Sequence, residues 1–295
     1  MDMLGRFAMK LAMLCFGILL ATALPVDAAS PAPADILKNS PDVDWRPLDP
    51  SSLLVMSLPA GPVVIDLAPA FAPASVANIT ALVRAHYFDG STVVRAQDNF
   101  VVQWAQDEER EKAAPALKGQ AEFERPLSAT FIALADSDTY AARTGFDGDF
   151  PAATDGRQEW LTHCYGMVAV ARDTAPDSGT GVELYAVIGQ APRQLDRNFT
   201  PVGRVVQGVE RLSVLPRGTG SLGFYQTAAE RVPIASIRFA SDLSSAEQPK
   251  LEVLKTSSAT FKAYVEARRN QIGMYVRPAG HMDVCNIPLP VRASR

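Results

Sequence analysis

The stretch from Tyr87 to Gln106 places three side chains suited to chemistry, Arg95, Phe100 and Gln103, inside an apolar, strand-like run. The guanidinium of an arginine is always charged and presents rigidly arranged hydrogen-bond donors. The chain has three histidines and three cysteines, without a Cys-x-x-Cys or cysteine–histidine cluster or a spacing typical of a nucleophile–base triad. This pattern favours chemistry by hydrogen bonding, with no metal and no cofactor. Read alone, Arg95 would be a surface arginine on a strand and Phe100 a core residue.

Sequence motifs extend on both sides of these residues. The segment YFDGSTVVR (residues 87–95), followed in register by Phe100 and Gln103, resembles the YxDGxxFHR signature of cyclophilin-type peptidyl-prolyl isomerases. Residues 163–205 resemble three further runs of bacterial cyclophilins: H-x-R-G-x-V-x-M-A-R, a GSQFFI-like strand and WLDGxxxVFGxV. Their order and gapless internal spacing argue against a chance match. The resemblance covers roughly residues 53–240.

The resemblance implies a mainly β fold, a cyclophilin-like closed antiparallel eight-stranded β-barrel capped by helices. Short apolar runs separated by turn clusters agree with a barrel. Leu53–Leu67, broken by Pro-Ala-Gly-Pro, is expected to form the first hairpin, and the alternating run Ile234–Phe239 the closing strand. A helix is expected to begin at Pro73, since proline is favoured in a first helical turn. The barrel domain is therefore assigned to residues 53–240.

Two regions extend beyond a compact member of that family. Residues 126–161 are expected to be a long insertion, either a functional loop or a self-packed excursion, because their aromatic residues argue against disorder throughout. Residues 241–295 are expected to be a C-terminal extension with a helix at about 258–271. Apolar residues share a stripe at helical spacing there, and Ser258 is suited to cap the first turn.

The resemblance assigns catalytic roles to Arg95, Phe100 and Gln103. Rotation about an X–Pro bond is opposed by amide resonance, with a barrier of about 18–20 kcal/mol. A catalyst needs only to stabilise the twisted amide, in which the proline nitrogen becomes pyramidal and accepts a hydrogen bond. Arg95 would donate that bond, Gln103 would hold a neighbouring backbone group of the substrate, and Phe100 would form a wall of the proline pocket.

Further residues around this set are expected to bind substrate: Val101, Ala171, Glu183, Tyr185, Leu195 and Phe199. Four positions depart from the family pattern, with Glu183 in place of a glutamine, Tyr185 of a phenylalanine, Gln194 of a tryptophan and Phe199 of a histidine. The hydroxyl of Tyr185 needs a partner when buried. Glu183 is suited to pair with Arg95, which would either orient the guanidinium or occupy it.

The chain is therefore expected to be a peptidyl-prolyl cis–trans isomerase that assists folding outside the cytoplasm, with proline-containing polypeptides as partners. The retained set of Arg95, Phe100 and Gln103 favours this hypothesis. The changes at Glu183, Tyr185, Gln194 and Phe199 favour an alternative, a catalytically weak module that binds proline-containing segments in a chaperone or assembly role. A third hypothesis gives the insertion and the C-terminal helix a structural role.

The N-terminus has the pattern of a secretory signal peptide. Arg6 and Lys10 precede the uninterrupted apolar run Leu11–Leu24, and Val26-Asp27-Ala28 offers a small-residue cleavage site. The run is shorter than the about 20 residues of a membrane span. Residues 1–28 are expected to be removed, leaving no stable membrane span, and the alternative is an uncleaved anchor. The Pro/Ala-rich segment 29–52 is expected to be an extended linker, in a periplasmic or secreted protein.

Charge and cysteine content bear on partners and compartment. A net charge of −4 without a basic face argues against nucleic acid as a partner. After removal of the signal peptide two cysteines remain, Cys164 and Cys285. In an oxidising compartment they are expected to form an intramolecular disulfide. The alternative is two separate buried thiols.

Overall fold

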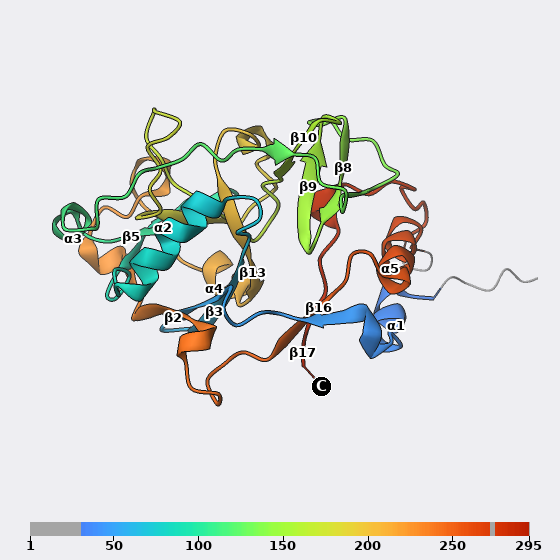
Figure 1. Cartoon of the computed structure of the whole chain (residues 1–295), viewed down its shortest axis with the longest axis horizontal. Coiled ribbons are helices and arrows are strands. Elements are labelled where there is room, and N and C mark those ends of the chain that lie inside the picture. The colour runs from blue at the N-terminus through green and yellow to red at the C-terminus, as the bar shows by residue number, and fades with distance from the viewer. Residues whose placement is uncertain (1–30, 272–274, 295) are drawn as a thin grey trace, which may run out of the picture.

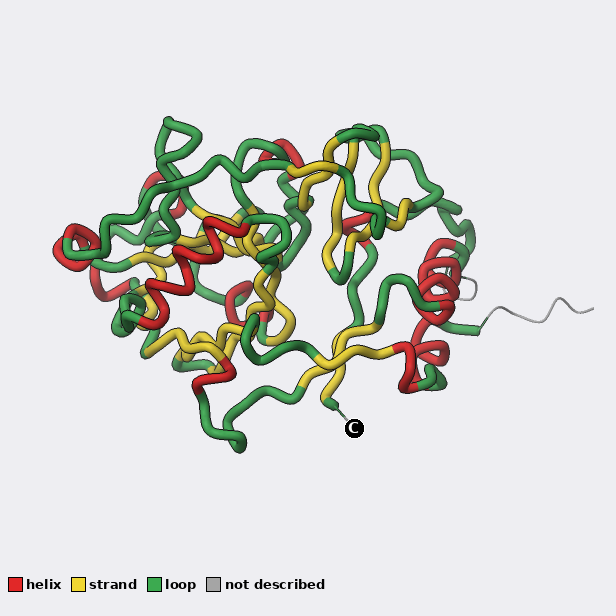
Figure 2. The backbone as a smooth tube through the Cα atoms, in the orientation of Figure 1, coloured by secondary structure: helices red, strands yellow, loops and turns green. Residues whose placement is uncertain are grey.

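The computed structural model describes residues 31–271 and 275–294 (Figure 1). Residues 1–28, the expected signal peptide, lie outside the described residues. Strands are the main regular element (Figure 2), and they form one large and two small sheets. Within the described ranges, no helix combines the length and the apolar character that a membrane crossing requires.

The large sheet is antiparallel and strongly curled. Its nine strands, in sheet order, are β14 (Val232–Pro233), β4 (Thr92–Ala96), β5 (Val101–Ala105), β12 (Leu184–Val187), β11 (Met167–Val170), β13 (Pro201–Gln207), β3 (Gly61–Leu67), β2 (Leu53–Leu58) and β15 (Ser236–Phe239). The mainly β class and the first hairpin, β2–β3, are confirmed. In place of the expected closed eight-stranded barrel, the structure has a nine-stranded half-barrel sheet. The expected closing strand Ile234–Phe239 is shorter than predicted, since β15 contains only Ser236–Phe239. β14 precedes this run in the chain and lies at the opposite edge of the sheet.

The pleat of each strand sends alternate side chains to opposite faces of this sheet. On β5, Val102 and Trp104 are fully buried in the core inside the curl, together with apolar residues of α2 (Pro73–Arg84). Val101 and Gln103 therefore point to the outer face. This alternation separates the residues that stabilise the fold from the residues that are available for a site.

The helix α2 begins at Pro73, as the sequence predicts. Its first backbone N–H groups have no acceptor within the helix. The carboxylate of Glu122 accepts hydrogen bonds from the N–H groups of Ala74 and Ser75, at 2.8 Å each. A negative charge there also complements the positive end of the helix dipole. Two further helices are short, α3 (Glu108–Lys112) and α4 (Val209–Ser213).

The expected insertion forms a separate five-stranded sheet, drawn in green in Figure 1. Its strands, in sheet order, are β6 (Arg125–Pro126), β10 (Gln158–Leu161), β9 (Phe150–Thr154), β8 (Arg143–Asp147) and β7 (Ile132–Ala133). Phe146 and Leu161 are buried in one cluster with Phe261, and the rings of Phe146 and Phe261 meet edge to face at 5.1 Å. The insertion is therefore folded, and its sheet packs against α5.

Residues 31–52 are folded, rather than extended as the expected linker. They contain α1 (Pro33–Lys38) and β1 (Trp45–Pro47), and β1 joins β16 (Leu251–Leu254) and β17 (Val291–Ala293) in a three-stranded sheet. Trp45 is 6% exposed and donates from its indole nitrogen to Ser40. The Pro/Ala-rich composition predicted an extended chain, but the burial of Trp45 anchors this segment to the C-terminal extension.

The C-terminal extension carries α5 (Ala259–Arg269), which lies beside α1 (Figure 1). The Oγ of Ser258 accepts a hydrogen bond from the backbone N–H of Phe261 at 3.0 Å, so Ser258 caps this helix as predicted. Further on, Cys285 forms a disulfide with Cys164, with Cα atoms 4.8 Å apart. The predicted bridge is confirmed, and it ties the C-terminal segment to the chain just before β11.

Candidate active site

Three neighbouring strands bring Arg95, Gln103 and Tyr185 into one row. Arg95 of β4 lies opposite Gln103 of β5, and Gln103 lies opposite Tyr185 of β12. Residues directly opposite each other on paired strands project from the same face of a sheet. Gln103 is on the outer face, so the row runs across the outside of the curled sheet.

A β-bulge at Val94 aims Arg95 at this face. The register between β4 and β5 shifts between Val93 and Arg95, so Val94 is an extra residue on β4. If Val94 were paired regularly with Gln103 instead, Arg95 would lie opposite Val102 and would point into the core. Bulges redirect side chains in this way next to functional sites.

A turn separates β4 from β5 within the strand-like run that contains Arg95, Phe100 and Gln103. Asn99 has a left-handed backbone with φ of 51°, which asparagine tolerates better than most residues. Its side-chain oxygen accepts a hydrogen bond from the backbone N–H of Gln190 at 2.7 Å. Arg95 and Gln103 are therefore on two strands of one hairpin, not on a single bent strand.

A pocket of about 150 Å³ opens beside the row. It is lined by Arg95, Phe100, Val101, Gln103, Ala171, Arg172, Tyr185, Leu195 and Phe199. The structure thus brings together every expected site residue except Glu183. A cavity of about 150 Å³ in another protein accommodates benzene. This pocket therefore has the size of one small ring, and its lining combines apolar side chains with the polar groups of Arg95, Gln103 and Arg172.

Polar contacts hold the guanidinium of Arg95 in a fixed orientation. Its Nε donates to the backbone oxygen of Leu222 at 2.7 Å, Nη1 donates to Oε1 of Gln103 at 3.0 Å, and Nη2 donates to Oε1 of Gln97. An arginine has five N–H groups. One N–H on each terminal nitrogen is therefore left without a partner among the described residues, and these two donors are available to a ligand.

Two aromatic rings flank the same guanidinium. The Cζ atom of Arg95 is 5.4 Å from the ring centre of Phe100 and 5.1 Å from that of Phe224. Both distances are within the range of a cation–π interaction. Phe224 belongs to the loop that also supplies the oxygen of Leu222. The sequence analysis missed this loop, because its contribution to Arg95 is a backbone carbonyl and a ring distant in sequence.

The loop reaches Arg95 through unusual backbone conformations. Leu222 has a left-handed φ of 55°, and Gly223 follows with a φ of 78°. A Cβ atom at Gly223 would lie 2.6 Å from the Cα atom of Gln97, so only glycine permits this close approach. The signal in the sequence was the glycine-rich run from Gly218 to Gly223.

Glu183 does not line the pocket but lies behind Gln103. Oε1 of Glu183 accepts a hydrogen bond from Nε2 of Gln103 at 2.6 Å, and Oε1 of Gln103 faces Arg95. Burial lowers the pKa of Arg95, against the opposing effect of Glu183, and an arginine still stays protonated. Burial raises the pKa of the Glu183 carboxyl, against the lowering effect of its hydrogen bond from Gln103. Glu183 therefore orients the amide of Gln103, and through it the guanidinium.

We expect Glu183→Gln to stabilise the protein at neutral pH. A carboxyl whose pKa is raised on folding loses stability as pH rises through its titration, because the buried charge is disfavoured. Glutamine keeps an oxygen that accepts from Gln103 but carries no charge. Thermal unfolding measured between about pH 4 and pH 8 should show an advantage of the variant that grows with pH. A difference in melting temperature between the variant and the parent that does not change with pH would contradict the raised pKa of Glu183.

The far wall of the pocket is aromatic and is braced by a second arginine. The rings of Tyr185 and Phe199 meet edge to face, 6.0 Å apart. Arg172 lies 4.5 Å from the ring centre of Phe199, and its Nε donates to the backbone oxygen of Asn198. The sequence motifs included Arg172 without giving it a role. Gln194 is exposed and lies outside the lining.

A larger cavity lies elsewhere, between the curled sheet and the insertion. It measures about 890 Å³ and is partly lined by aromatic residues. Four of its charged groups form pairs with one another, Arg46 with Asp149 and Arg125 with Asp147, and Lys255 donates to the backbone oxygen of Val43. The small pocket is the better candidate, because Arg95 offers donors there that have no partner. Within residues 31–271 and 275–294, no group of histidine, cysteine and carboxylate side chains gathers as a metal site would require.

Comparison with known families agrees with this geometry. Residues 53–238 match the sequence model of the family described as cyclophilin type peptidyl-prolyl cis-trans isomerase/CLD. The match spans more than half of the chain and contains the whole row of Arg95, Gln103 and Tyr185. The chain therefore belongs to the cyclophilin-type peptidyl-prolyl cis–trans isomerases, a family of enzymes.

Solved structures of cyclophilins resemble the chain as well. The crystal structure of cyclophilin AquaCyp293 from Hirschia baltica is 24% identical in sequence, and the match covers 86% of this chain and 96% of that chain with a TM-score of 0.70. At this identity the likeness shows the fold. A cyclophilin-type isomerase from Cryptosporidium parvum, crystallised in the presence of the dipeptide Ala-Pro, is 13% identical over 63% of this chain and 98% of that chain, with a TM-score of 0.41. No curated protein matches the chain in sequence.

Proposed function

We propose that the chain accelerates rotation about X–Pro peptide bonds in polypeptides outside the cytoplasm, with Arg95 as the catalytic hydrogen-bond donor. One observation carries the proposal: the fixed guanidinium of Arg95 has two N–H groups without partners among the described residues, and it lies beside a ring-sized pocket with apolar walls at Phe100, Leu195 and Phe199. The pyrrolidine ring of proline is apolar and fits between Phe100, Leu195 and Phe199. In that pose the proline nitrogen lies within reach of Arg95.

The mechanism follows from the origin of the barrier. Amide resonance keeps the nitrogen planar and its lone pair delocalised, so the planar ground state accepts poorly at nitrogen. In the twisted state the lone pair is localised and accepts a hydrogen bond from Arg95. This interaction is stronger in the transition state than in the ground state, which is the condition for catalysis. Gln103, oriented by Glu183, donates its remaining N–H to a backbone carbonyl of the substrate.

A second candidate function is binding of proline-containing segments without efficient turnover. The observation that favours it is the occupation of Arg95, whose Nε, Nη1 and Nη2 already donate to Leu222, Gln103 and Gln97. An arginine held this firmly moves less to follow the twisting amide. The protein would then bind exposed proline-containing segments of unfolded chains and hold them without isomerising them.

The location outside the cytoplasm is supported by two features of the chain. The Cys164–Cys285 disulfide is of the kind that persists in oxidising compartments. The sequence before residue 29 has the charge, apolar core and cleavage pattern of a signal peptide. We infer that the mature protein begins at Ala29 and acts on exported chains, whose prolines isomerise within tens to hundreds of seconds unaided.

An exchange experiment on an Ala-Pro peptide tests the proposal. The mature chain, residues 29–295, is added below the peptide concentration, and the cis and trans signals are followed by NMR. Isomerase activity should produce exchange cross-peaks between the two forms at mixing times where the free peptide has none. Shifted signals without exchange would favour the binding module, and unchanged signals would contradict both candidates.

A further inference from the structure

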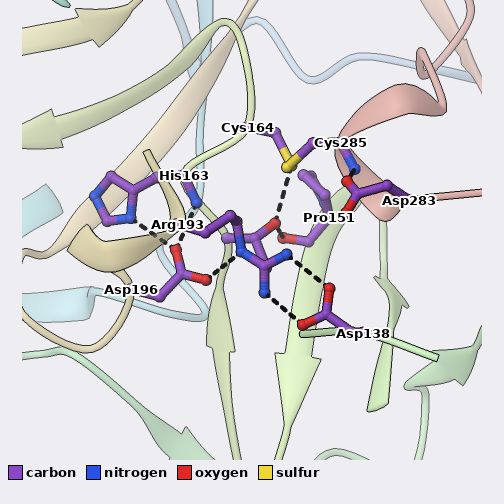
Figure 3. The surroundings of a disulfide bond; sticks show 9 residues. Asp138, Pro151, His163, Cys164, Arg193, Asp196, Asp283 and Cys285 are labelled. Carbon is purple, nitrogen blue, oxygen red and sulfur yellow. Dashed lines mark hydrogen bonds and ion pairs between the residues drawn. A yellow bond between two sulfur atoms is a disulfide. The ribbon is translucent and has the colours of Figure 1, made fainter. Parts of the chain in front are cut away.

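A buried chain of polar groups connects the insertion with the floor of the pocket, and Figure 3 shows most of it. In the insertion, Asp138 accepts two hydrogen bonds from the terminal nitrogens of Arg193, at 3.0 and 3.2 Å. Nε of Arg193 donates to Asp196. Asp196 lies 3.1 Å from Nδ1 of His163, and Nε2 of His163 lies 3.1 Å from the hydroxyl of Tyr185.

All members of this chain are buried. His163 is fully buried, and the side chains of Arg193 and Asp138 are 3% and 2% exposed. Charges at such depth must be paired, or they destabilise the fold. Burial alone would lower the pKa of Arg193, but Asp196 and Asp138 raise it above its usual value. The ion pair is therefore permanent, and it fixes Asp196 beneath His163.

The hydrogen-bond direction follows from the donors and acceptors available. Oδ1 of Asp196 also accepts from the backbone N–H of His163 at 2.8 Å, and a carboxylate only accepts. Nδ1 of His163 therefore carries a proton, and Nε2 shares a hydrogen bond with the hydroxyl of Tyr185. The hydroxyl end of Tyr185 is held at His163, while the Tyr185 ring lines the pocket and meets Phe199 edge to face.

We propose that His163 is a positioning residue of the isomerase, which holds the ring of Tyr185 in the pocket wall through the tyrosine hydroxyl. Asp138 holds His163 in turn, through Arg193 and Asp196, so the insertion contributes to the pocket. This proposal rests on the proposed function. Its physical basis is that a buried hydroxyl without a partner is costly. Deprived of Nε2, the hydroxyl of Tyr185 would turn towards solvent, and the ring would move into the space that the proline occupies.

Two substitutions of one residue separate positioning from general support of the fold. His163→Asn keeps an N–H near the place of Nδ1 for Asp196 but loses the partner of Tyr185. His163→Gln keeps a polar group near the place of Nε2 for Tyr185 but loses Asp196. We expect His163→Asn to lower kcat/KM about tenfold and His163→Gln to restore most of that loss. Both variants should have similar melting temperatures.

The variant Tyr185→Phe supplies the matched background, because it removes only the hydroxyl. When His163→Asn or His163→Gln is added to Tyr185→Phe, the two double variants should have equal kcat/KM. When Asp138→Asn is added to Tyr185→Phe, it should lower the melting temperature but leave kcat/KM at the value of Tyr185→Phe alone. Equal activities of the two His163 variants in the parent protein would overturn the proposal. So would a tenfold loss from His163→Asn that persists in Tyr185→Phe.

A spectroscopic readout keeps this test independent of catalysis. With ring-labelled tyrosine, the NMR signal of Tyr185 is the one that Tyr185→Phe removes. It should shift or broaden in His163→Asn and stay in place in His163→Gln. An unchanged signal in His163→Asn would overturn the positioning role whatever the activity. A moved signal in a protein without isomerase activity would refute the proposed function and leave the positioning of Tyr185 standing.

Discussion

Arg95→Ala is expected to lower kcat/KM for an X–Pro substrate by about 100-fold or more, with a much smaller change in substrate affinity. Removing one preorganised donor aimed at the charge of a transition state typically costs this much. The lost hydrogen bond is made mainly when the proline nitrogen becomes pyramidal, so turnover falls more than binding. Protease-coupled turnover and peptide titration, measured on the same samples, give the two quantities.

Arg172→Ala is the matched control for this experiment. Arg172 lines the same pocket and carries the same charge, but it packs on Phe199 and donates to Asn198. We expect its loss to raise KM modestly and to leave kcat within a few-fold of the parent, as for a residue that contributes uniform binding. Equal losses for the two arginines would refute the special role of Arg95, and full activity of Arg95→Ala would favour the binding module.

Replacing both Cys164 and Cys285 by alanine should lower the free energy of unfolding by about 2–5 kcal/mol. The disulfide joins residues separated by 121 positions, so it restricts a long loop of the unfolded chain. Cys164 is 5% exposed and lies in the apolar cluster between the curled sheet and α5, where alanine is tolerated. Urea unfolding at equilibrium measures the effect.

Reduction provides the control for this prediction. A strong thiol reductant should lower the stability of the parent protein to about that of the double variant, and it should leave the double variant unchanged. A double variant as stable as the oxidised parent would show that the C-terminal segment is held by other contacts, such as the pairing of β17 with β16.

The side chains of the pocket were accessible to sequence reasoning because they follow local patterns. Arg95, Phe100 and Gln103 lie within a short stretch of sequence, and the resemblance of their spacing to a family motif was the basis for placing them together. The helix α2 and the disulfide were predicted for similar reasons, a proline at a first turn and two remaining cysteines. The motif and the proline signal each involve residues that are close in sequence, and the disulfide follows from there being only two cysteines left to pair.

Long-range contacts left no such signal. The contact of Arg95 with Leu222 uses a backbone carbonyl, which any residue supplies. The pairing of Asp138 with Arg193 spans 55 residues, and neither residue differs in type from an ordinary surface charge. The burial of Trp45 overrode a composition typical of a linker. In each case tertiary packing decided the outcome, and composition carried no information about it.

The bulge at Val94 makes the proposed activity depend on the register of β4 as well as on the identity of its residues. If Val94 instead paired regularly with Gln103, the residues of β4 beyond it would exchange faces, and Arg95 would lie opposite Val102 and point into the core. Deleting Val94, by contrast, would remove the extra residue and leave Arg95 opposite Gln103. A slip of one position in this pairing would thus leave an inert scaffold with every site residue still present in its sequence. Alignments that score residue identity while ignoring strand pairing would not detect that loss.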